Sequence, residues 1–556
     1  MRDPLRHLNP KILLCIVAAL LAIVVQSGEL GSADTMHRLQ TAHSFWTSEP
    51  PVFPNEYPEF GLHGRGGKLY GWYGIGQPLL MLPADIIGTY IEKLPVFNDY
   101  RGNDPTVRNI FVTYTINVLL NVLTVLVAFR FLQLLEFNVL ESVAGVLALL
   151  FCTTHLHYTQ NMMENNYICL LTLTGLCFQY EWLRTGSMRA LAIGSGAFGL
   201  NLLTRLTTML DLLSGAAFLI LCYGLINGDR ISDIRVGTGA HVGTGVHARP
   251  VEQSSTIVPI DSRFFKLAIN YLKTALPIYL MFLFFDRLYQ FYRFGNWTTT
   301  YVHYFAIEHR LQDPSLPANY PWETPFHVGF LGPLITIDKS IFLFDPLIVL
   351  TILVCVFAWR WFNTSTKAYV VTAFLLVLGY ICLYARYTVW SGDFAWGDRY
   401  VSTAVELAAF ISVPILLKYR PQLGTVIWKI GLTLIFVSLV IQIASLAFWL
   451  PLEIYQADDF GHPQFVIWLR FKNIVAFALG KMDAWHLDTD SMTYDHWDYE
   501  HITTWNFLPF VLRRMGATPK WVLDLVFSLW GIAIAGLMYS LWGLRRALTH
   551  PQESVA

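Results

Sequence analysis

The chain has 556 residues, of which 54% are hydrophobic and only 14% are charged, whereas soluble domains carry about 25% charged residues. This composition excludes an ordinary soluble domain and a disordered chain. The net charge of −1 gives no basic field for nucleic acid, and the seven cysteines lie in apolar runs without the spacing of a zinc site or a disulfide framework.

Apolar stretches of about 20 residues recur along the chain, and each predicts a membrane-spanning helix because a backbone in hydrocarbon must satisfy its own hydrogen bonds. We therefore expect an all-α polytopic membrane protein with about twelve spans. The expected spans are 11–27, 108–130, 139–157, 165–182, 188–208, 211–227, 266–290, 341–360, 368–387, 400–418, 428–450 and 521–544. The first is interpreted as a helix rather than a signal peptide, because no clear cleavage site follows it.

Arginine and lysine gather in one set of connecting loops, which by the positive-inside rule predicts that these loops and both termini face the cytoplasm. The longest of these loops is the linker 228–265. Its glycine-rich stretch 237–247 lacks the Gly-Lys-Ser/Thr of a phosphate-binding loop, so we interpret it as a flexible linker.

The opposite face receives long loops rich in aromatic residues, proline, histidine and acids, at 28–107, 291–340, 388–399 and 451–520. The expected organisation is a transmembrane core (1–450), an extracytoplasmic loop or lid (451–520), and a last helix with a cytoplasmic tail (521–556). Within the first loop, the apolar run 76–87 predicts a short helix along the membrane interface. Functional residues are therefore expected on the extracytoplasmic face.

A helix with paired charges is predicted directly after the first span. Ser32 can cap a helix that begins at Ala33, with Asp34 in its first turn and Arg38 four residues later on the same face. One interpretation is a surface ion pair of little energetic value. The other is a general base, Asp34, beside a cation that can hold a phosphate.

Two further groups belong to the same face. Trp72, Tyr73 and Gln77 lie in a glycine-rich stretch that suits close approach of backbone to a ligand, although aromatic anchoring in the interface is an equal alternative. Glu164 lies near two histidines and offers a carboxylate for a divalent ion, but the spacing matches no standard ligand set.

Three more cations are candidates for binding an anion. Arg205 interrupts an apolar segment, where a charge is costly unless it is paired, and Asp211 is one candidate partner. Lys339 and Arg399 flank expected spans on the outer side, where together they can neutralise a phosphate at headgroup depth. Snorkelling to the membrane surface is the alternative for Lys339.

The order of these motifs resembles that of polytopic membrane glycosyltransferases that use polyprenyl-phosphate sugars, the group that includes protein O-mannosyltransferases and the aminoarabinose transferase of lipid A. The matching segments are Glu29 with Asp34 and Arg38, Trp72 to Gln77, Tyr158 with Glu164, Thr204-Arg205, Gly332 to Pro346, and Trp390 to Tyr400. The sequence departs from the family where its adjacent acidic pair is replaced by Glu29 and Asp34, and where Asp393 replaces a glycine.

The resemblance implies transfer of a sugar from a polyprenyl-phosphate donor to an acceptor hydroxyl on the outer face of a bacterial inner membrane, with inversion. The implied catalytic residues are Asp34 and Glu29, and the implied donor-phosphate ligands are Arg38, Arg205, Lys339 and Arg399. The implied substrate-binding residues are Tyr73, Gln77, Tyr158, Glu164, Trp390 and Asp393. A lipid, glycan or protein acceptor is left open, as is a magnesium or manganese ion on Asp34 and Glu164.

Two other classes of function are weighed against this one. A lipid or solute transporter would place paired charges near the bilayer midplane, often in inverted repeats, whereas the ionisable residues here mostly gather at the outer rim. A non-catalytic assembly protein would use its exterior loops only to bind a partner. A labelled donor separates transfer from binding alone.

Overall fold

The computed structural model describes residues 9–53, 61–101, 103–237, 262–392, 395–449, 451–458, 462–481, 504–516 and 518–549. In these ranges helices predominate, and the one sheet is an antiparallel pair, β1 (Leu62–His63) and β2 (Leu69–Tyr70). This confirms the expected all-α class. Asp393 and the glycine-rich stretch 238–247 lie outside the described residues, as do residues 482–503 of the expected lid.

The α-helices follow one another along the chain as α1 (Pro10–Val25), α2 (Ala33–Ser44), α3 (Gly76–Glu92), α4 (Val107–Leu134), α5 (Val139–Cys152), α6 (His155–Gln160), α7 (Asn165–Thr185), α8 (Met188–Thr204), α9 (Met209–Gly237), α10 (Ser262–Phe294), α11 (Tyr301–Gln312), α12 (Phe326–Ile335), α13 (Ile341–Phe344), α14 (Leu347–Ala358), α15 (Thr364–Tyr384), α16 (Ser402–Ala409), α17 (Ser412–Lys418), α18 (Arg420–Ser445), α19 (Pro451–Asp458), α20 (Val466–Ala478), α22 (Leu508–Met515) and α23 (Lys520–Thr549). Short 3₁₀ turns are η2 (Arg65–Gly67), η3 (Pro95–Tyr100), η4 (Leu206–Thr208) and η5 (Trp359–Trp361).

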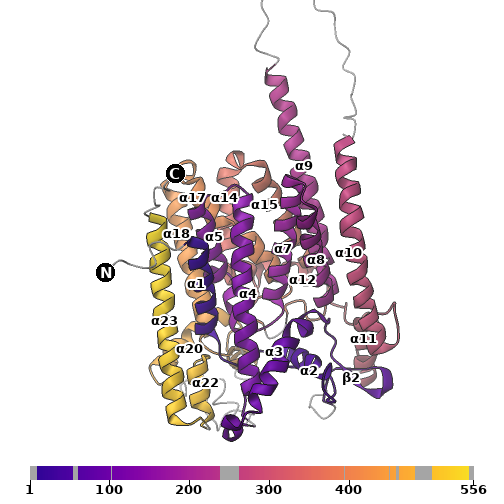
Figure 1. The fold of residues 1–556 in the computed structure, drawn as a ribbon, viewed down its shortest axis with the longest axis vertical. Helices are drawn as coiled ribbons and strands as arrows, with labels where there is room; N and C mark the ends of the chain where they lie inside the picture. Colours follow the sequence, from indigo (N-terminus) through magenta and orange to yellow (C-terminus); the bar gives the residue numbers. More distant parts are fainter. Residues whose placement is uncertain are drawn as a thin grey trace, which may run out of the picture.

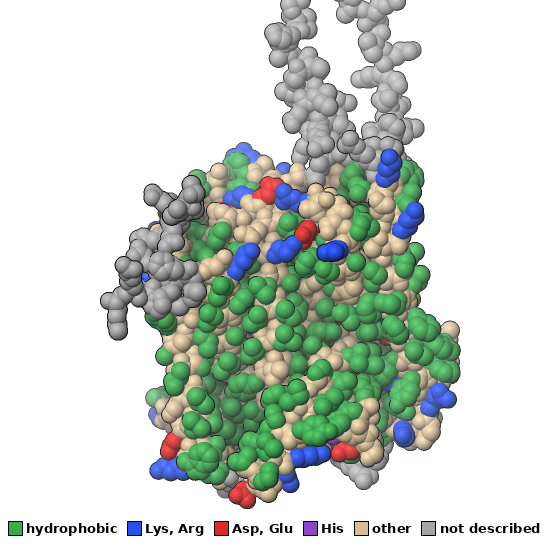
Figure 2. Space-filling model, in the orientation of Figure 1, with side chains coloured by type: hydrophobic (Ala, Val, Ile, Leu, Met, Phe, Trp, Pro, Cys, Tyr) green, Lys and Arg blue, Asp and Glu red, His purple; other side chains and the backbone are tan. Residues whose placement is uncertain are grey.

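Among the described residues, six helices are long and apolar enough to cross a membrane, by length and composition. They are Val107–Leu134, Leu206–Gly224, Phe264–Phe294, Thr364–Tyr384, Arg420–Ser445 and Lys520–Thr549. Most of the helices stand side by side in one bundle (Figure 1). Hydrophobic side chains cover a broad band of its surface, and Lys, Arg, Asp and Glu gather at the two ends (Figure 2). These features agree with the expected membrane protein.

Six candidate spans do not support the twelve expected from the sequence, and that number was wrong for the described chain. Two expected spans are interrupted: 341–360 divides into α13, α14 and η5, and 400–418 divides into α16 and α17. Others form shorter helices, such as α1 with 16 residues and α5 with 14 residues. Such breaks are tolerated inside a bundle, because neighbouring helices satisfy the freed backbone groups.

The helix α7 shows why composition alone miscounts spans. It has 21 residues, but polar side chains interrupt its apolar sequence, including Asn165, Asn166 and Gln179. These side chains are buried and hydrogen-bonded to other parts of the protein, for example Gln179 to the Tyr279 hydroxyl at 2.6 Å. A helix whose polar side chains bond to neighbouring protein does not need a uniformly apolar surface, so α7 lacks the composition of a candidate span.

The helix ends determine where the polar residues meet. The last residues of α1, the first residues of α7 and the last residues of α8 lie at one end of the bundle. The helices α2 and α3 pack at this same end (Figure 1). Residues 395–400, which precede α16, reach the same end through contacts described below. We call this the α2 end of the bundle.

Candidate functional site

The position of α2 follows from two hydrogen-bonding residues at its start. The Ser32 side chain accepts a hydrogen bond from the Thr35 backbone N–H at 3.2 Å, which confirms the predicted N-cap and places Asp34 in the first turn. The Thr35 hydroxyl donates to the Met162 carbonyl at 2.9 Å. This bond attaches α2 to the segment that precedes α7, so Asp34 faces the helix ends.

Asp34 forms its ion pair with Arg399, 365 residues away, rather than with Arg38. Arg399 Nη1 lies 2.8 Å from Asp34 Oδ2, and the other carboxylate oxygen accepts a hydrogen bond from the Tyr73 hydroxyl. The Arg38 guanidinium lies over the Tyr73 ring, 4.0 Å from its centroid. The side chains of Asp34 and Arg399 keep 18% and 16% of their surface exposed, so this pair can be reached from outside.

Glu164, directly before α7 begins, forms ion pairs with two arginines. Arg38 Nη2 lies 2.7 Å from its Oε2, and Arg205, which caps the end of α8, binds its Oε1. Asp211, the partner that the sequence suggested for Arg205, instead accepts from the Tyr380 hydroxyl at 3.0 Å. The helices α2, α7 and α8 are therefore joined through one buried carboxylate.

We refer to Asp34, Arg38, Glu164, Arg205 and Arg399 as the ion-pair network. Its three guanidinium groups face two carboxylates, so one positive charge is left over. Two of its buried N–H groups, Arg38 Nη1 and Arg399 Nε, have no acceptor among the residues that the structure describes. Buried donors are normally satisfied, so these two are suited to an anion that enters the network.

The arginines set the protonation of the network. Burial raises the pKa of Asp34, but Arg399 and Arg38 outweigh it and hold the pKa below its usual value. Burial acts on Glu164 in the same way, and Arg38 and Arg205 bring its pKa well below the usual range. Burial lowers the pKa of His37 to about 4, so this neighbour is uncharged at neutral pH.

The glycines before α3 let the Tyr73 loop pack closely against the backbone at the end of α8. A Cβ at Gly74 would collide with the carbonyl oxygens of Leu203 and Thr204 at the end of α8. Arg293 Nη1 donates to the Tyr73 carbonyl at 2.9 Å. These contacts hold the Tyr73 hydroxyl at Asp34.

Two predicted substrate ligands, Gln77 and Tyr158, are directed at backbone carbonyls. Gln77 is buried in α3 and donates to the Met162 carbonyl at 3.1 Å. The buried Tyr158 hydroxyl donates to the Trp396 carbonyl at 3.4 Å. Each side chain therefore positions a segment next to the network.

Lys339 supports the loop that carries Arg399. Its ammonium group donates to the carbonyls of Ala395 at 3.0 Å and Gly397 at 3.4 Å. From the other side, Asn165 donates to the Arg399 carbonyl at 2.8 Å. Lys339 thus acts on the backbone that places the Arg399 guanidinium.

Asp398, the residue before Arg399, is a buried carboxyl group. Its Oδ1 accepts from the Tyr400 backbone N–H at 3.0 Å. Burial raises the pKa of Asp398 to about 7, although the Tyr400 hydrogen bond and Lys339 lower it.

Two other predicted site residues contact different parts of the protein. Glu29 accepts from Arg514 of α22 at 2.8 Å, and burial raises its pKa despite this arginine. Trp390 lies against Gly332 of α12, where a larger residue would collide with the indole. The structure therefore groups Asp34, Arg38, Tyr73, Glu164, Arg205 and Arg399, and ties Glu29 and Trp390 to other elements.

Tyr400 ends one of the segments that carry the family resemblance, but it was not predicted as a site residue. The Arg399 and Arg205 guanidinium groups lie 5.2 Å and 5.1 Å from its ring centroid, which fixes both cations next to one aromatic ring. The adjacency of Arg399 and Tyr400 in the sequence does not reveal that Arg205 joins them.

A divalent ion does not fit between Asp34 and Glu164 in this arrangement. Three of their four carboxylate oxygens already meet arginine donors, and the fourth meets the Tyr73 hydroxyl. A magnesium or manganese ion would have to displace guanidinium groups, and it would add to a positive charge already in excess.

No protein-family model matches the chain, and no curated protein matches it. The assignment of function therefore depends on the chemistry of the ion-pair network and on the order of the sequence motifs.

Proposed function

We propose that this protein transfers a sugar from a polyprenyl-phosphate donor to an acceptor hydroxyl at the α2 end of the bundle. The observation that carries the proposal is the network itself: an accessible carboxylate, Asp34, beside three guanidinium groups with excess positive charge and two unsatisfied N–H donors among the described residues. A phosphodiester donor supplies the anion that such a site lacks.

In the proposed step, Asp34 accepts the proton of the acceptor hydroxyl as that oxygen attacks the anomeric carbon. The bond between this carbon and the phosphate oxygen breaks, and the polyprenyl phosphate leaves with the bonding electrons. One displacement inverts the anomeric configuration. Arg38, Arg205 and Arg399 stabilise the negative charge that develops on the phosphate.

Binding of the donor also prepares the base. In the donor-free network, Arg399 lowers the pKa of Asp34 and makes it a weak base. A phosphate that attracts the Arg399 guanidinium weakens this ion pair, and the remaining burial raises the pKa of Asp34 toward the range useful for general-base catalysis. Asp34 keeps free lone pairs on both oxygens while it is paired.

The position of the site in the cell is part of the proposal. The arginine-rich loops of the opposite face favour a cytoplasmic location for that face, so the α2 end is assigned to the outer face of a bacterial inner membrane. The donor then arrives already activated on its lipid, and no nucleotide is required. We expect turnover without added magnesium or manganese, and a lipid, glycan or protein hydroxyl as acceptor.

The direct experiment uses the full-length protein in nanodiscs with radiolabelled polyprenyl-phosphate sugars and a panel of acceptors. Formation of a labelled product and release of polyprenyl phosphate support the proposal. Binding of the donor without product would indicate an assembly protein, and movement of intact donor between leaflets would indicate a flippase. Either result would overturn the proposed transfer.

Replacing Arg38 with alanine should weaken donor binding, because it removes a charged group with an N–H that has no acceptor among the described residues. Charge-assisted hydrogen bonds contribute about 1.5–3 kcal/mol, so we expect a rise in donor Kd of about 10- to 150-fold. Arg38→Lys should recover part of this loss. The control is Arg184→Ala, which removes a 42% exposed arginine at the far end of α7. Equal donor affinity in Arg38→Ala and the control would contradict the role of Arg38.

The pH profile should show that Asp34 stays ionised in mildly acidic solution. A base is lost when it is protonated, and a lowered pKa moves that loss to lower pH. The ratio kcat/KM for the donor reports the donor-free protein, in which Arg399 still lowers the pKa of Asp34, so this ratio should not fall between about pH 7 and pH 5. In Arg399→Gln the burial of Asp34 remains while the cation is gone, so the acid limb should move to higher pH. An acid limb at the same pH in both proteins would exclude this coupling.

A further inference from the structure

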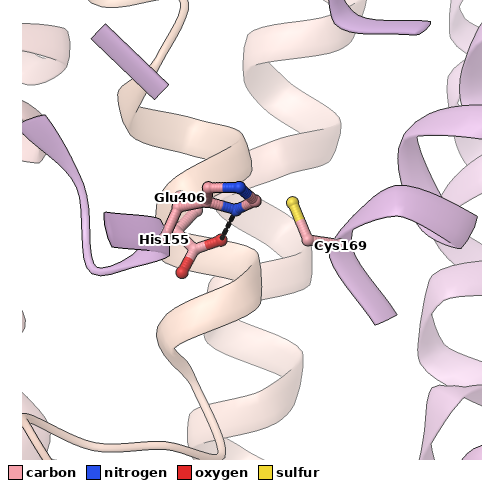
Figure 3. Close-up of side chains that lie close together, drawn as sticks. All are labelled: His155, Cys169 and Glu406. Carbon is pink, nitrogen blue, oxygen red and sulfur yellow. Dashed lines mark ion pairs between the residues drawn. The ribbon is translucent and has the colours of Figure 1, made fainter. Parts of the chain in front are cut away.

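A second polar cluster, made of residues outside the ion-pair network, is buried inside the bundle. His155 of α6, Cys169 of α7 and Glu406 of α16 are fully buried, and their ligand atoms all lie within 4.8 Å of one another. Figure 3 shows the imidazole and the carboxylate facing each other, with the thiol directed toward them. His155 Nδ1 lies 3.8 Å from Glu406 Oε2, which is too far for a hydrogen bond.

The protonation of His155 follows from its neighbour Asn121. The Asn121 amide nitrogen donates to the Asn117 carbonyl at 2.9 Å, so its oxygen is turned toward His155 Nε2, 3.1 Å away. Nε2 therefore carries the hydrogen, and Nδ1 of the neutral ring presents a lone pair. Metal-binding histidines are commonly oriented by such a bond on the other ring nitrogen.

Two carboxyl groups of this region share a single hydroxyl hydrogen. Thr154 donates its backbone N–H to Asp345 at 2.7 Å, but its hydroxyl, with one hydrogen, lies 3.1 Å from Asp345 and 3.0 Å from Glu406. That hydrogen can serve only one of them at a time. Among the described residues, Glu406 Oε2 and His155 Nδ1 are buried without a hydrogen-bond partner of regular geometry, and the Cys169 side chain interacts with the Glu406 carboxylate. Two buried lone pairs that face each other in this way are expected to share a cation.

We propose that His155, Cys169 and Glu406 bind a zinc ion. Imidazole nitrogen, thiolate and carboxylate are the ligand types that zinc prefers, at about 2.0–2.3 Å from the ion. The separation of Nδ1 and Oε2 lets one ion contact both atoms, and rotation of the Cys169 side chain brings in the sulfur. Binding releases the thiol proton, and the resulting thiolate and carboxylate balance the charge of the ion.

The ion would join three helices that lead to the ion-pair network. Glu406 lies in α16, seven residues after Arg399, and Asn165 at the start of α7 bonds the Arg399 carbonyl. A zinc ion between α6, α7 and α16 would therefore hold the two segments that carry Glu164 and Arg399. Its role is structural, because the fully buried ligands leave no access for a substrate.

The test is the metal content of the full-length protein, purified in detergent, stripped with chelator, incubated with zinc alone and desalted. We expect about one zinc ion per chain by mass spectrometry of the metals. Cys169→Ser should reduce retained zinc at least tenfold. The matched control is Cys177→Ser, which changes a buried cysteine two turns further along α7. Asn121→Leu, which changes only the orienting residue, should lower zinc affinity about 10- to 100-fold.

Cobalt substitution gives a second measurement that does not depend on activity. Thiolate-bound cobalt has a charge-transfer absorption in the near ultraviolet, which should appear in the wild type and in Cys177→Ser and be absent from Cys169→Ser. Wild type that retains no zinc after incubation, or equal loss in Cys169→Ser and Cys177→Ser, would overturn the proposal. Should Cys169→Ser fail to fold, the zinc content and cobalt spectrum of the wild type decide the question.

Discussion

Asp34→Asn should abolish most of the sugar transfer while leaving the protein folded. The amide has nearly the shape of the carboxylate but cannot accept the proton of the acceptor hydroxyl. General-base assistance contributes about 10²–10⁴ in rate, so kcat should fall by that factor. The amide oxygen can still accept hydrogen bonds from Arg399 and from the Tyr73 hydroxyl, so the protein should remain folded although the charge of the pair is lost.

The experiment compares kcat, donor KM and thermal unfolding for the wild type, Asp34→Asn and Asp313→Asn. Asp313 is an exposed aspartate that bonds the nearby Ser315, and it serves as the matched control. The change at Asp34 should appear in kcat far more than in KM. Near-normal turnover by Asp34→Asn would remove the carboxylate from the mechanism, whereas a large fall in Tm would show that the residue is structural.

Arg470→Met should destabilise the fold strongly, because it breaks a fully buried ion pair. Arg470 Nε donates to Glu453 Oε1 and Arg470 Nη2 donates to Glu453 Oε2, each at 2.7 Å. Both side chains are fully buried. Arg470 also donates to the carbonyls of Ser445 at 2.9 Å and Phe448 at 2.7 Å. Removing one partner of a buried pair leaves an uncompensated charge and costs about 3–5 kcal/mol.

Thermal unfolding in detergent should show this as a strongly reduced Tm. Because Glu453 is left unpaired, adding Glu453→Gln to Arg470→Met should recover part of the loss. The control is Arg130→Met, which breaks a pair with Glu181 in which the arginine is 50% exposed; its cost should be about 0–1 kcal/mol. Similar Tm values for Arg470→Met and Arg130→Met would contradict the importance of the buried pair.

Arg470 also connects the C-terminal helices to the candidate site. Its guanidinium lies 5.3 Å from the centroid of the Trp396 ring, and Trp396 stacks on His157. Trp396 precedes Arg399 in the same loop. The helix α20 therefore contacts the loop that places the Arg399 guanidinium, and Glu453 of α19 holds Arg470 in position.

Local sequence patterns were sufficient for features that depend on neighbouring residues. The N-cap at Ser32 and the helix that follows it could be predicted, because capping involves residues three positions apart. Long apolar runs such as Val107–Leu134 and Thr364–Tyr384 were recognised for the same reason. The number of spans could not be obtained this way, because packing decides where an apolar run is interrupted, as in 341–360 and 400–418.

The order of residues alone was enough to establish an all-α protein with helices that can cross a membrane, and a capped helix with Asp34 in its first turn. The identity of the charges that meet came from the packing: Asp34 with Arg399, Glu164 with two arginines, and Glu29 with Arg514. The physical reason is that a local pattern reports contacts within a few residues. The choice of an ionic partner, or the meeting of His155, Cys169 and Glu406, depends on how distant helix ends pack together.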